Sequence, residues 1–252
     1  MTDRHTVIGA GQPAELAELF HRLCADVGRQ GVIGFSDATQ ANLLTEQEQH
    51  LRRLLRPLGP SGSVTAVSLG LLFHQHEVMA IPGEWAATKA EAPAWGDYAS
   101  AFTAVNGQLN RIAQELARRG KGVYEPATIS GLASTLGHVK EYFAHCVSHR
   151  VYAEAAGIGW RGRHGLIVTT QAGPALRLAT VFVPGNSAVA PTSPGDCGDC
   201  RACLEVCPLL STARDYREAC RRHKIALGLE PDVCGICVRV CWEQVRGRWP
   251  AG

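Results

Sequence analysis

The sequence lacks long hydrophobic runs and an excess of charge of either sign. Its apolar stretches are only a few residues long, far short of the roughly 18–20 residues that span a bilayer. The 25 Lys and Arg against 23 Asp and Glu leave a net charge of +2, which gives no broad basic field for nucleic acid. Residues 1–9 show neither the basic nor the hydrophobic region of a secretory signal. We therefore expect a cytoplasmic protein without a membrane segment.

Cysteine, by contrast, is abundant and unevenly distributed. Eight of the 10 cysteines lie between Cys197 and Cys241. A cytoplasmic protein has little use for four disulfides, so clustered thiols favour metal ligands or catalytic groups. Of the other two, Cys24 lies among the apolar positions of an expected helix, which favours a buried, inert thiol. Cys146 stands between two histidines, but no second motif indicates a metal site there.

The first 185 residues interleave predicted helices with predicted strands, which is typical of an α/β or α+β domain. Apolar residues at three- and four-residue spacing predict the helices, and β-rich apolar runs predict the strands. The expected helices cover 13–28, 45–56, 100–119 and 148–156, and the expected strands cover 64–73, 166–170 and 176–183. The stretch 184–195 is rich in Pro, Gly, Ser and Ala, which predicts a linker. We therefore expect two domains, over 1–185 and 186–252.

Four cysteines and a proline form the run CGDCRACLEVCP over 197–208. This is the C-x2-C-x2-C-x3-C-P spacing of a bacterial-type [4Fe–4S] site. Three thiolates two residues apart can bind three corners of one cluster, while the fourth points to a second cluster. Zinc is the competing interpretation, because C-x2-C pairs also build zinc ribbons. A triple spacing of this kind is poorly suited to four tetrahedral zinc ligands, so the run favours iron and sulfur.

A second run, CGICVRVC over 234–241, supplies three more cysteines, and Cys220 makes up a second set of four. The crossing rule of two-cluster ferredoxins then predicts how the two runs share their ligands. One cluster is expected on Cys197, Cys200, Cys203 and Cys241. The other is expected on Cys207, Cys220, Cys234 and Cys237. Trp242 follows the last cysteine where the pattern has proline. Two adjacent clusters indicate a protein that transfers electrons.

The segment GIGWRG over 157–162 matches G-x-G-x-x-G. A dinucleotide site requires a strand before this motif, a helix after it and an acidic residue about 20 positions further on. Here a predicted helix precedes it, and no acidic residue occurs between Glu154 and Asp196, which argues against a dinucleotide. The glycines permit either close approach of the backbone to a ligand or a tightly packed turn. The neighbouring Trp160, Arg161, Arg163 and His164 are able to contact amides and a phosphate.

Several of these features together resemble epoxyqueuosine reductase and its short relatives with two [4Fe–4S] clusters. They are SHR over 148–150, AGIGWRGR over 156–163, LIVT over 166–169 and the two cysteine runs. The resemblance covers about residues 95–252 and extends more distantly to corrinoid reductive dehalogenases. It implies a nitroreductase-like domain that binds cobalamin, followed by a small ferredoxin-like domain with two clusters.

In that family an external donor of the ferredoxin or flavodoxin type sends electrons through the clusters to cobalt, which reduces the substrate. The resemblance therefore places the glycine segment at the cobalamin. The implied cofactor-binding residues are Gly157, Gly159, Trp160, Gly162, Arg163 and His164.

The resemblance also implies catalytic residues at the start of a helix. The family has an Asp-Tyr-His triplet there, whose aspartate is thought to protonate the substrate. The matching residues here are Asp97 and Tyr98, followed by Ala99 in place of histidine. The alternative for Asp97 is an ordinary acidic residue that the helix dipole favours in the first turn.

Two departures from the family bear on the substrate. Arg163-His164 replaces the family's Lys-Asn, and only 11 residues follow Cys241, so we expect no tRNA-binding extension. We therefore expect a cobalamin-dependent iron–sulfur reductase of a small organic substrate, rather than an enzyme that acts on tRNA. The alternative is an electron-transfer or corrinoid-activating protein without a substrate of its own.

Overall fold

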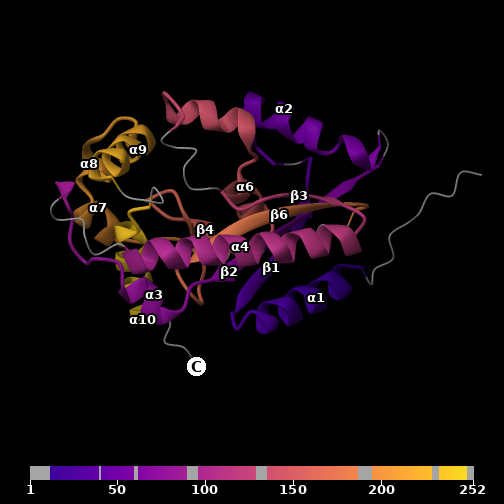
Figure 1. Cartoon of the computed structure of the whole chain (residues 1–252), viewed down its shortest axis with the longest axis horizontal. Coiled ribbons are helices and arrows are strands. Elements are labelled where there is room, and N and C mark those ends of the chain that lie inside the picture. The colour runs from indigo at the N-terminus through magenta and orange to yellow at the C-terminus, as the bar shows by residue number, and fades with distance from the viewer. Residues whose placement is uncertain are drawn as a thin grey trace, which may run out of the picture.

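A four-stranded antiparallel sheet lies at the centre of the computed structural model, with strand order β1-β2-β6-β3 (Figure 1). Its strands are β1 (Gly31–Asp37), β2 (Val64–Leu72), β6 (Leu176–Pro184) and β3 (Val123–Glu125). A separate hairpin pairs β4 (Trp160–Arg161) with β5 (Ile167–Val168). The structure describes residues 12–39, 41–59, 62–89, 96–128, 135–186, 195–228 and 233–248.

Helices cover both faces of this sheet. They are α1 (Gln12–Asp26), α2 (Thr45–Leu54), α3 (Gln75–Met79), α4 (Gly96–Arg119) and α6 (His149–Ala155), with 3-10 turns η1 (Arg56–Leu58) and η4 (Val139–His145). Successive strand residues point to opposite faces, so Val67 and Leu69 of β2 join a core with α1 and α4. Ala66 faces the other way and packs in a cluster with Tyr152 of α6.

The sequence located most of these elements to within a few residues. The run over 64–73 forms β2, which is buried at every position after the first, as an apolar run without alternation predicts. α4 begins at Gly96, one turn before the expected start. β5 is shorter than expected and pairs with β4 instead of β6. β1 was not expected, because Gly28 and Gly31 indicate the end of the preceding helix.

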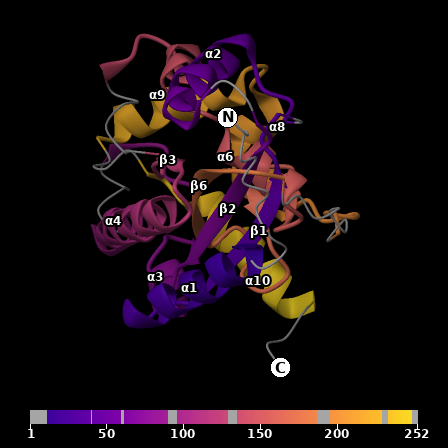
Figure 2. The same ribbon diagram turned by 90° about the vertical axis from the view of Figure 1, so that its right-hand side faces the viewer.

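The cysteine-bearing segment folds into four helices, where the sequence showed only weak patterning. They are α7 (Ala202–Val206), α8 (Pro208–Thr212), α9 (Tyr216–Leu227) and α10 (Ile236–Arg248). α7, α8 and α9 gather at one end of the molecule (Figure 1), and Figure 2 shows α1 and α2 on opposite sides of the sheet. α10 packs against α7 and α3, and Trp242 of α10 joins the core under α4. The boundary expected at 185/186 stays a prediction, and most of the expected linker, 187–194, lies outside the described residues.

Among the described residues, no helix combines the length and apolar character that crossing a bilayer requires.

Candidate iron–sulfur centre

Four cysteines from three separate elements lie near the start of α10, close enough for their charges to shift one another's thiol pKa. Cys207 stands between α7 and α8, where Pro208 occupies the first helical position, as proline favours. Cys220 lies in the middle of α9. Cys234 and Cys237 flank the first turn of α10. We call these four residues the second cysteine group.

Their proximity shows in the electrostatics of the thiols. Burial raises the pKa of the Cys237 thiol well above its ordinary value, and the charges of neighbouring cysteines raise it further. Those neighbours are Cys220, Cys234, Cys207 and Cys203. The pKa of Cys234 is raised to about 11, first by burial and then by Cys220 and Cys207, although a hydrogen bond from the Ile236 N–H opposes this. These four thiols therefore lie close to one another, and Cys203 is a further neighbour of Cys237.

The remaining four cysteines of this segment come from the loop before α7, from α7 itself and from α10. Cys197 and Cys200 are close enough to Cys203 to raise the pKa of its thiol, after burial as the largest cause. Cys197 and Cys241 both pack against one apolar cluster, formed by Trp160, Val168 and Val245. We call Cys197, Cys200, Cys203 and Cys241 the first cysteine group. Cys203 also influences Cys237 of the second group, so the division into two sets of four ligands stays a prediction.

The chemistry of the second group fits a polynuclear iron centre. Four adjacent thiolates would carry four negative charges in a partly buried place, and such charges require compensation. Among the described residues, Lys224 is the cation that lowers these thiol pKa values, and it acts on Cys220 and Cys234. A bound metal centre would supply the missing positive charge and deprotonate the thiols. In the described part of the chain, no three His, Cys, Asp or Glu side chains converge on a point as the ligands of one ion would.

Tyr98 and Asp97 lie next to each other in the first turn of α4 but in different environments. Tyr98 is 3% exposed, and its ring packs on Gly235, where a Cβ atom would lie 2.5 Å from the ring. Gly235 also has a φ of +72°, which favours glycine. Burial raises the pKa of Tyr98, and Cys237 and Cys234 raise it further. Asp97 is exposed. Tyr98 therefore borders the second cysteine group, and the catalytic role of both residues stays a prediction.

The glycine segment forms the β4–β5 hairpin, which packs against the protein itself. A Cβ atom at Gly159 would lie 2.3 Å from the carbonyl oxygen of Val168. A Cβ atom at Gly162 would lie 2.7 Å from the ring of His164. Trp160 is buried in the apolar cluster beside the first cysteine group, and Gly157, with a φ of +69°, follows α6. These contacts favour the tightly packed turn, and cobalamin binding by this segment stays a prediction.

Two residues of the hairpin turn connect it to its surroundings in different ways. Arg163 donates from Nη2 to the Gly198 carbonyl at 2.8 Å and from Nε to the Cys200 carbonyl at 3.1 Å. It therefore fixes the loop that carries the first cysteine group. His164 is 5% exposed and accepts a hydrogen bond at Nδ1 from the Leu166 N–H. Its Nε2 has no partner among the described residues, and burial lowers its pKa to about 4.

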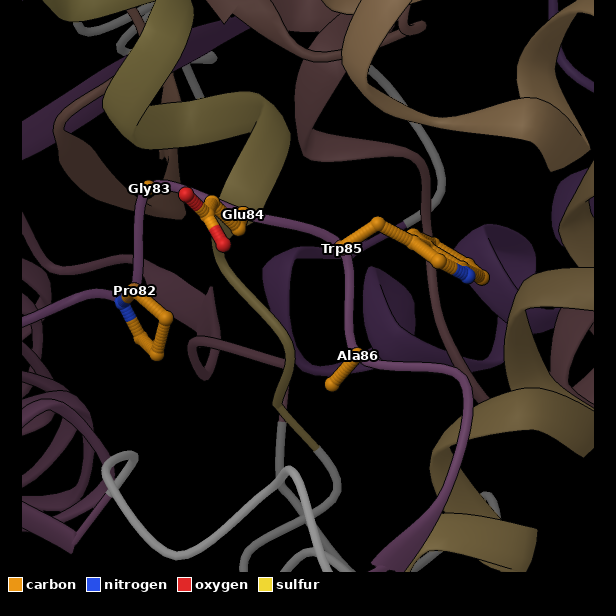
Figure 3. A pocket seen from close by; sticks show the side chains of 5 residues that line it. All are labelled: Pro82, Gly83, Glu84, Trp85 and Ala86. Atoms are coloured by element: carbon orange, nitrogen blue, oxygen red, sulfur yellow. The ribbon is translucent and has the colours of Figure 1, made fainter.

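A loop between α3 and α4 contacts α9 close to Cys220, and no sequence motif indicated this contact. The Trp85 ring stacks on His223, with centroids 4.1 Å apart and planes 12° apart. His223 lies one turn after Cys220 in α9. The same loop lines a cavity of about 450 Å³, formed by Pro82, Gly83, Glu84, Trp85 and Ala86. In Figure 3 the Trp85 ring points away from the other four side chains.

The two cysteines outside the cysteine-rich segment are buried and inert. Burial raises the pKa of Cys24 to about 12 and that of Cys146 to about 12. The Cys146 thiol donates to the Tyr142 carbonyl at 3.5 Å. A buried thiol with a raised pKa is a poor nucleophile and a poor ligand.

Curated relatives resemble part of the chain. Epoxyqueuosine reductase of Alicycliphilus denitrificans is 34% identical over 87 residues, which cover 29% of this chain and 24% of that enzyme. The enzyme of Escherichia coli is 33% identical over 91 residues, covering 31% of this chain and 24% of the relative. The chain resembles epoxyqueuosine reductase. The match spans about a quarter of the length of these relatives, and no protein-family model matches the chain.

Solved structures extend the likeness to the whole fold. A reductive dehalogenase, whose structure is described as suggesting a mechanism for B12-dependent dehalogenation, is 14% identical, with a TM-score of 0.57. The alignment covers 100% of this chain and 36% of the dehalogenase. A catabolic reductive dehalogenase is 15% identical, with a TM-score of 0.55, covering 94% of this chain and 32% of the other. At these identities the likeness establishes the mixed helix-and-sheet fold alone.

Proposed function

We propose that the protein is an iron–sulfur oxidoreductase whose eight clustered cysteines hold two [4Fe–4S] clusters. The clusters pass single electrons to a cobalamin, which reduces a small organic substrate. The observation that carries the proposal is the second cysteine group, in which thiols from three elements lie together in one partly buried place. A buried cysteine with only a packing role does not need other cysteines beside it. The resemblance to epoxyqueuosine reductase supports the same class of chemistry.

Several residues of the chain support the clusters without binding iron. Tyr98 covers the second group with its ring and excludes water there. Arg163 fixes the loop of the first group through two carbonyl oxygens. Glu218 and Arg221 anchor α9: Glu218 accepts from the Val139 N–H at 2.9 Å, and Arg221 donates to the Leu136 carbonyl at 3.0 Å. When bound, [4Fe–4S] clusters supply one-electron transfer.

The cobalamin part of the proposal rests on the fold shared with reductive dehalogenases. The described cavity of about 450 Å³ does not fit this cofactor. A corrinoid is larger than the drug-sized ligands for which cavities of roughly 300–1,000 Å³ are typical, and five residues of one loop line this cavity. We therefore assign no residue of that loop to cobalamin. In the proposal, the exposed Asp97 donates the proton that the reduced substrate takes up.

Anaerobic reconstitution tests the proposal. We expect about eight irons and eight sulfides per chain, and an EPR signal of reduced [4Fe–4S] clusters after treatment with dithionite. Titration with cob(II)alamin, followed by EPR, tests the cofactor separately. Binding with a changed cobalt spectrum would support the cobalamin enzyme. About eight irons without corrinoid binding would contradict that part and leave an electron-transfer protein. Fewer than four irons per chain would contradict the cluster assignment itself.

A further inference from the structure

Two arginines from separate elements meet at one phenol oxygen. Arg217, in the first turn of α9, donates from Nε to the Tyr216 Oη at 3.4 Å, and its guanidinium carbon lies 5.9 Å from the centre of the Tyr216 ring. Arg150 of α6 also hydrogen-bonds Tyr216. All three side chains are partly exposed. Within the described residues, neither arginine forms an ion pair with a carboxylate.

The turn of the β4–β5 hairpin lies beside these side chains. Arg150 donates from Nη1 to the Gly165 carbonyl at 2.6 Å. A Cβ atom at Gly165 would lie 2.1 Å from Tyr216 Oη and 3.5 Å from Arg150 Nη1. Gly165 also has a φ of +76°, which favours glycine, and a side chain there would meet the Tyr216 hydroxyl. α6, the hairpin turn and the start of α9 thus lie together at one positively charged site.

Among the described residues, no carboxylate pairs with the charges of Arg150 and Arg217. Burial, followed by the charge of Arg217, lowers the pKa of Arg150 to about 10, and Arg161 contributes in the same direction. Arg161 pairs with Glu154, but no further acidic residue occurs before Asp196. Asp215 faces elsewhere: it caps α9 by accepting from the Glu218 N–H and lies 3.9 Å from His138.

Arg177, which is half-buried like Arg150 and Arg217, has a fuller set of partners. It donates to Asn106 Oδ1 at 2.7 Å and to the Thr128 carbonyl at 3.1 Å, and its guanidinium lies 4.0 Å over the Phe102 ring. Arg217 has only a long contact with a neutral phenol. The contrast indicates that the Arg217 guanidinium keeps donors for a ligand, while Arg150, held by the Gly165 carbonyl, adds its charge beside it.

We propose that Arg150, Arg217 and Tyr216 form a binding site for the phosphate group of a small ligand. Two guanidinium groups match the charge of a phosphate monoester and can donate hydrogen bonds in pairs. The Tyr216 hydroxyl, whose oxygen accepts from Arg217, keeps its own proton to donate. A protein that binds a nucleic-acid backbone makes about 6–10 contacts with phosphates. Two arginines are too few for such contacts, so a small ligand is favoured. The site does not depend on the proposed reductase activity.

Calorimetric titration of the reconstituted full chain tests this site. Inorganic phosphate and adenosine monophosphate are the probes, and sodium acetate at equal ionic strength is the control salt. We expect saturable binding of one phosphate group per chain. Tighter binding of the nucleotide would indicate a nucleotide as the source, and equal binding would indicate free phosphate. Arg217→Gln should weaken binding about 10- to 100-fold, as the loss of a charged hydrogen bond predicts.

The matched control is Arg222→Gln, in the same helix, because Arg222 is exposed and pairs with Glu218. It should leave the dissociation constant within about twofold. Without phosphate, Arg217→Gln should keep or raise the melting temperature, because it removes a repulsion, and Arg150→Lys should bind phosphate more weakly despite its charge. Equal heats with acetate, unchanged binding in Arg217→Gln, or binding of an RNA stem-loop alone would each overturn the proposal.

Discussion

The central sheet and the cysteine-bearing helices differ in how far apolar side chains account for their structure. β2 is buried from its second residue to its last, and α4 buries a continuous apolar face along 24 residues. α7 and α8 have five residues each; α7 buries only Cys203, and α8 buries none. Helices this short are not stable alone. The sheet region therefore depends on its core, while the cysteine segment depends on a few docking contacts and on its thiols.

The largest expected effect is the response of the two regions to iron removal. After anaerobic chelation, amide hydrogens of α7, α8 and α9 should exchange at least about 100-fold faster, because metal binding free energy becomes folding free energy in such segments. Amides of β2 and β6 should keep their protection, since apolar packing holds them. Hydrogen exchange with mass spectrometry measures both regions at once. Equal protection of α9 with and without iron would show that its contacts with η4 suffice.

The second prediction separates the two cysteine groups. Cys220→Ala removes the one cysteine of the 197–241 segment that lies outside both sequence runs, and it should lower the iron content to about four per chain while the first group keeps its cluster. Cys24→Ala is the matched control, because Cys24 is buried away from this segment, and should retain about eight irons. Iron quantification with EPR checks both. Full iron content in Cys220→Ala would show that another residue is the eighth ligand.

These regions also differ in what could be predicted from sequence. α1, β2 and α4 follow from apolar periodicity, because that periodicity is the physical cause of their burial. Counting cysteines pointed to Cys220, and the structure places it with the second group. The contacts of Arg163 could not be predicted from the sequence, because its acceptors are backbone carbonyl groups, which carry no sequence signature. The Trp85–His223 stack could not be predicted either, because no sequence motif near one residue indicates a contact with the other.

The third prediction concerns Tyr98, which touches both regions. Its ring lies 5.5 Å from Phe73 within the core and packs on Gly235 beside the second cysteine group. Tyr98→Ala should lower the free energy of unfolding by about 3–5 kcal/mol and broaden the EPR signal of one cluster. Tyr98→Phe should cost less than about 1.5 kcal/mol. Urea denaturation under anaerobic conditions measures the stability of each variant.

Phe102→Ala is the control for Tyr98, one turn further along α4 on the same buried face. It should destabilise the protein by a similar amount while both cluster signals stay unchanged. A perturbed cluster in Phe102→Ala would mean that the signals report general loosening of α4. Full stability with lost turnover in Tyr98→Phe would assign the hydroxyl group a catalytic role.

The smallest expected effect is a pH dependence shared by the sheet and the hairpin. Burial lowers the pKa of His149 to about 4 and that of His164 to about 4, against about 6.5 in an unfolded chain. Between these values the unfolded chain binds protons that the folded chain does not, so stability falls as the pH drops from 6.5 towards 4. Each histidine should contribute on the order of 3 kcal/mol, present in full above pH 6.5.

His149→Gln separates the two contributions. The His149 ring lies between the Thr180 hydroxyl and the Pro126 carbonyl, each at 2.9 Å, and glutamine offers a donor and an acceptor without titrating. Urea denaturation between pH 7.5 and 4 should show about half the wild-type loss in this variant, and the wild-type loss in the control His21→Gln, whose side chain is exposed. Because Thr180 belongs to β6, the His149 contribution should also persist without iron. Its disappearance on chelation would contradict the independence of the sheet from the cysteine segment.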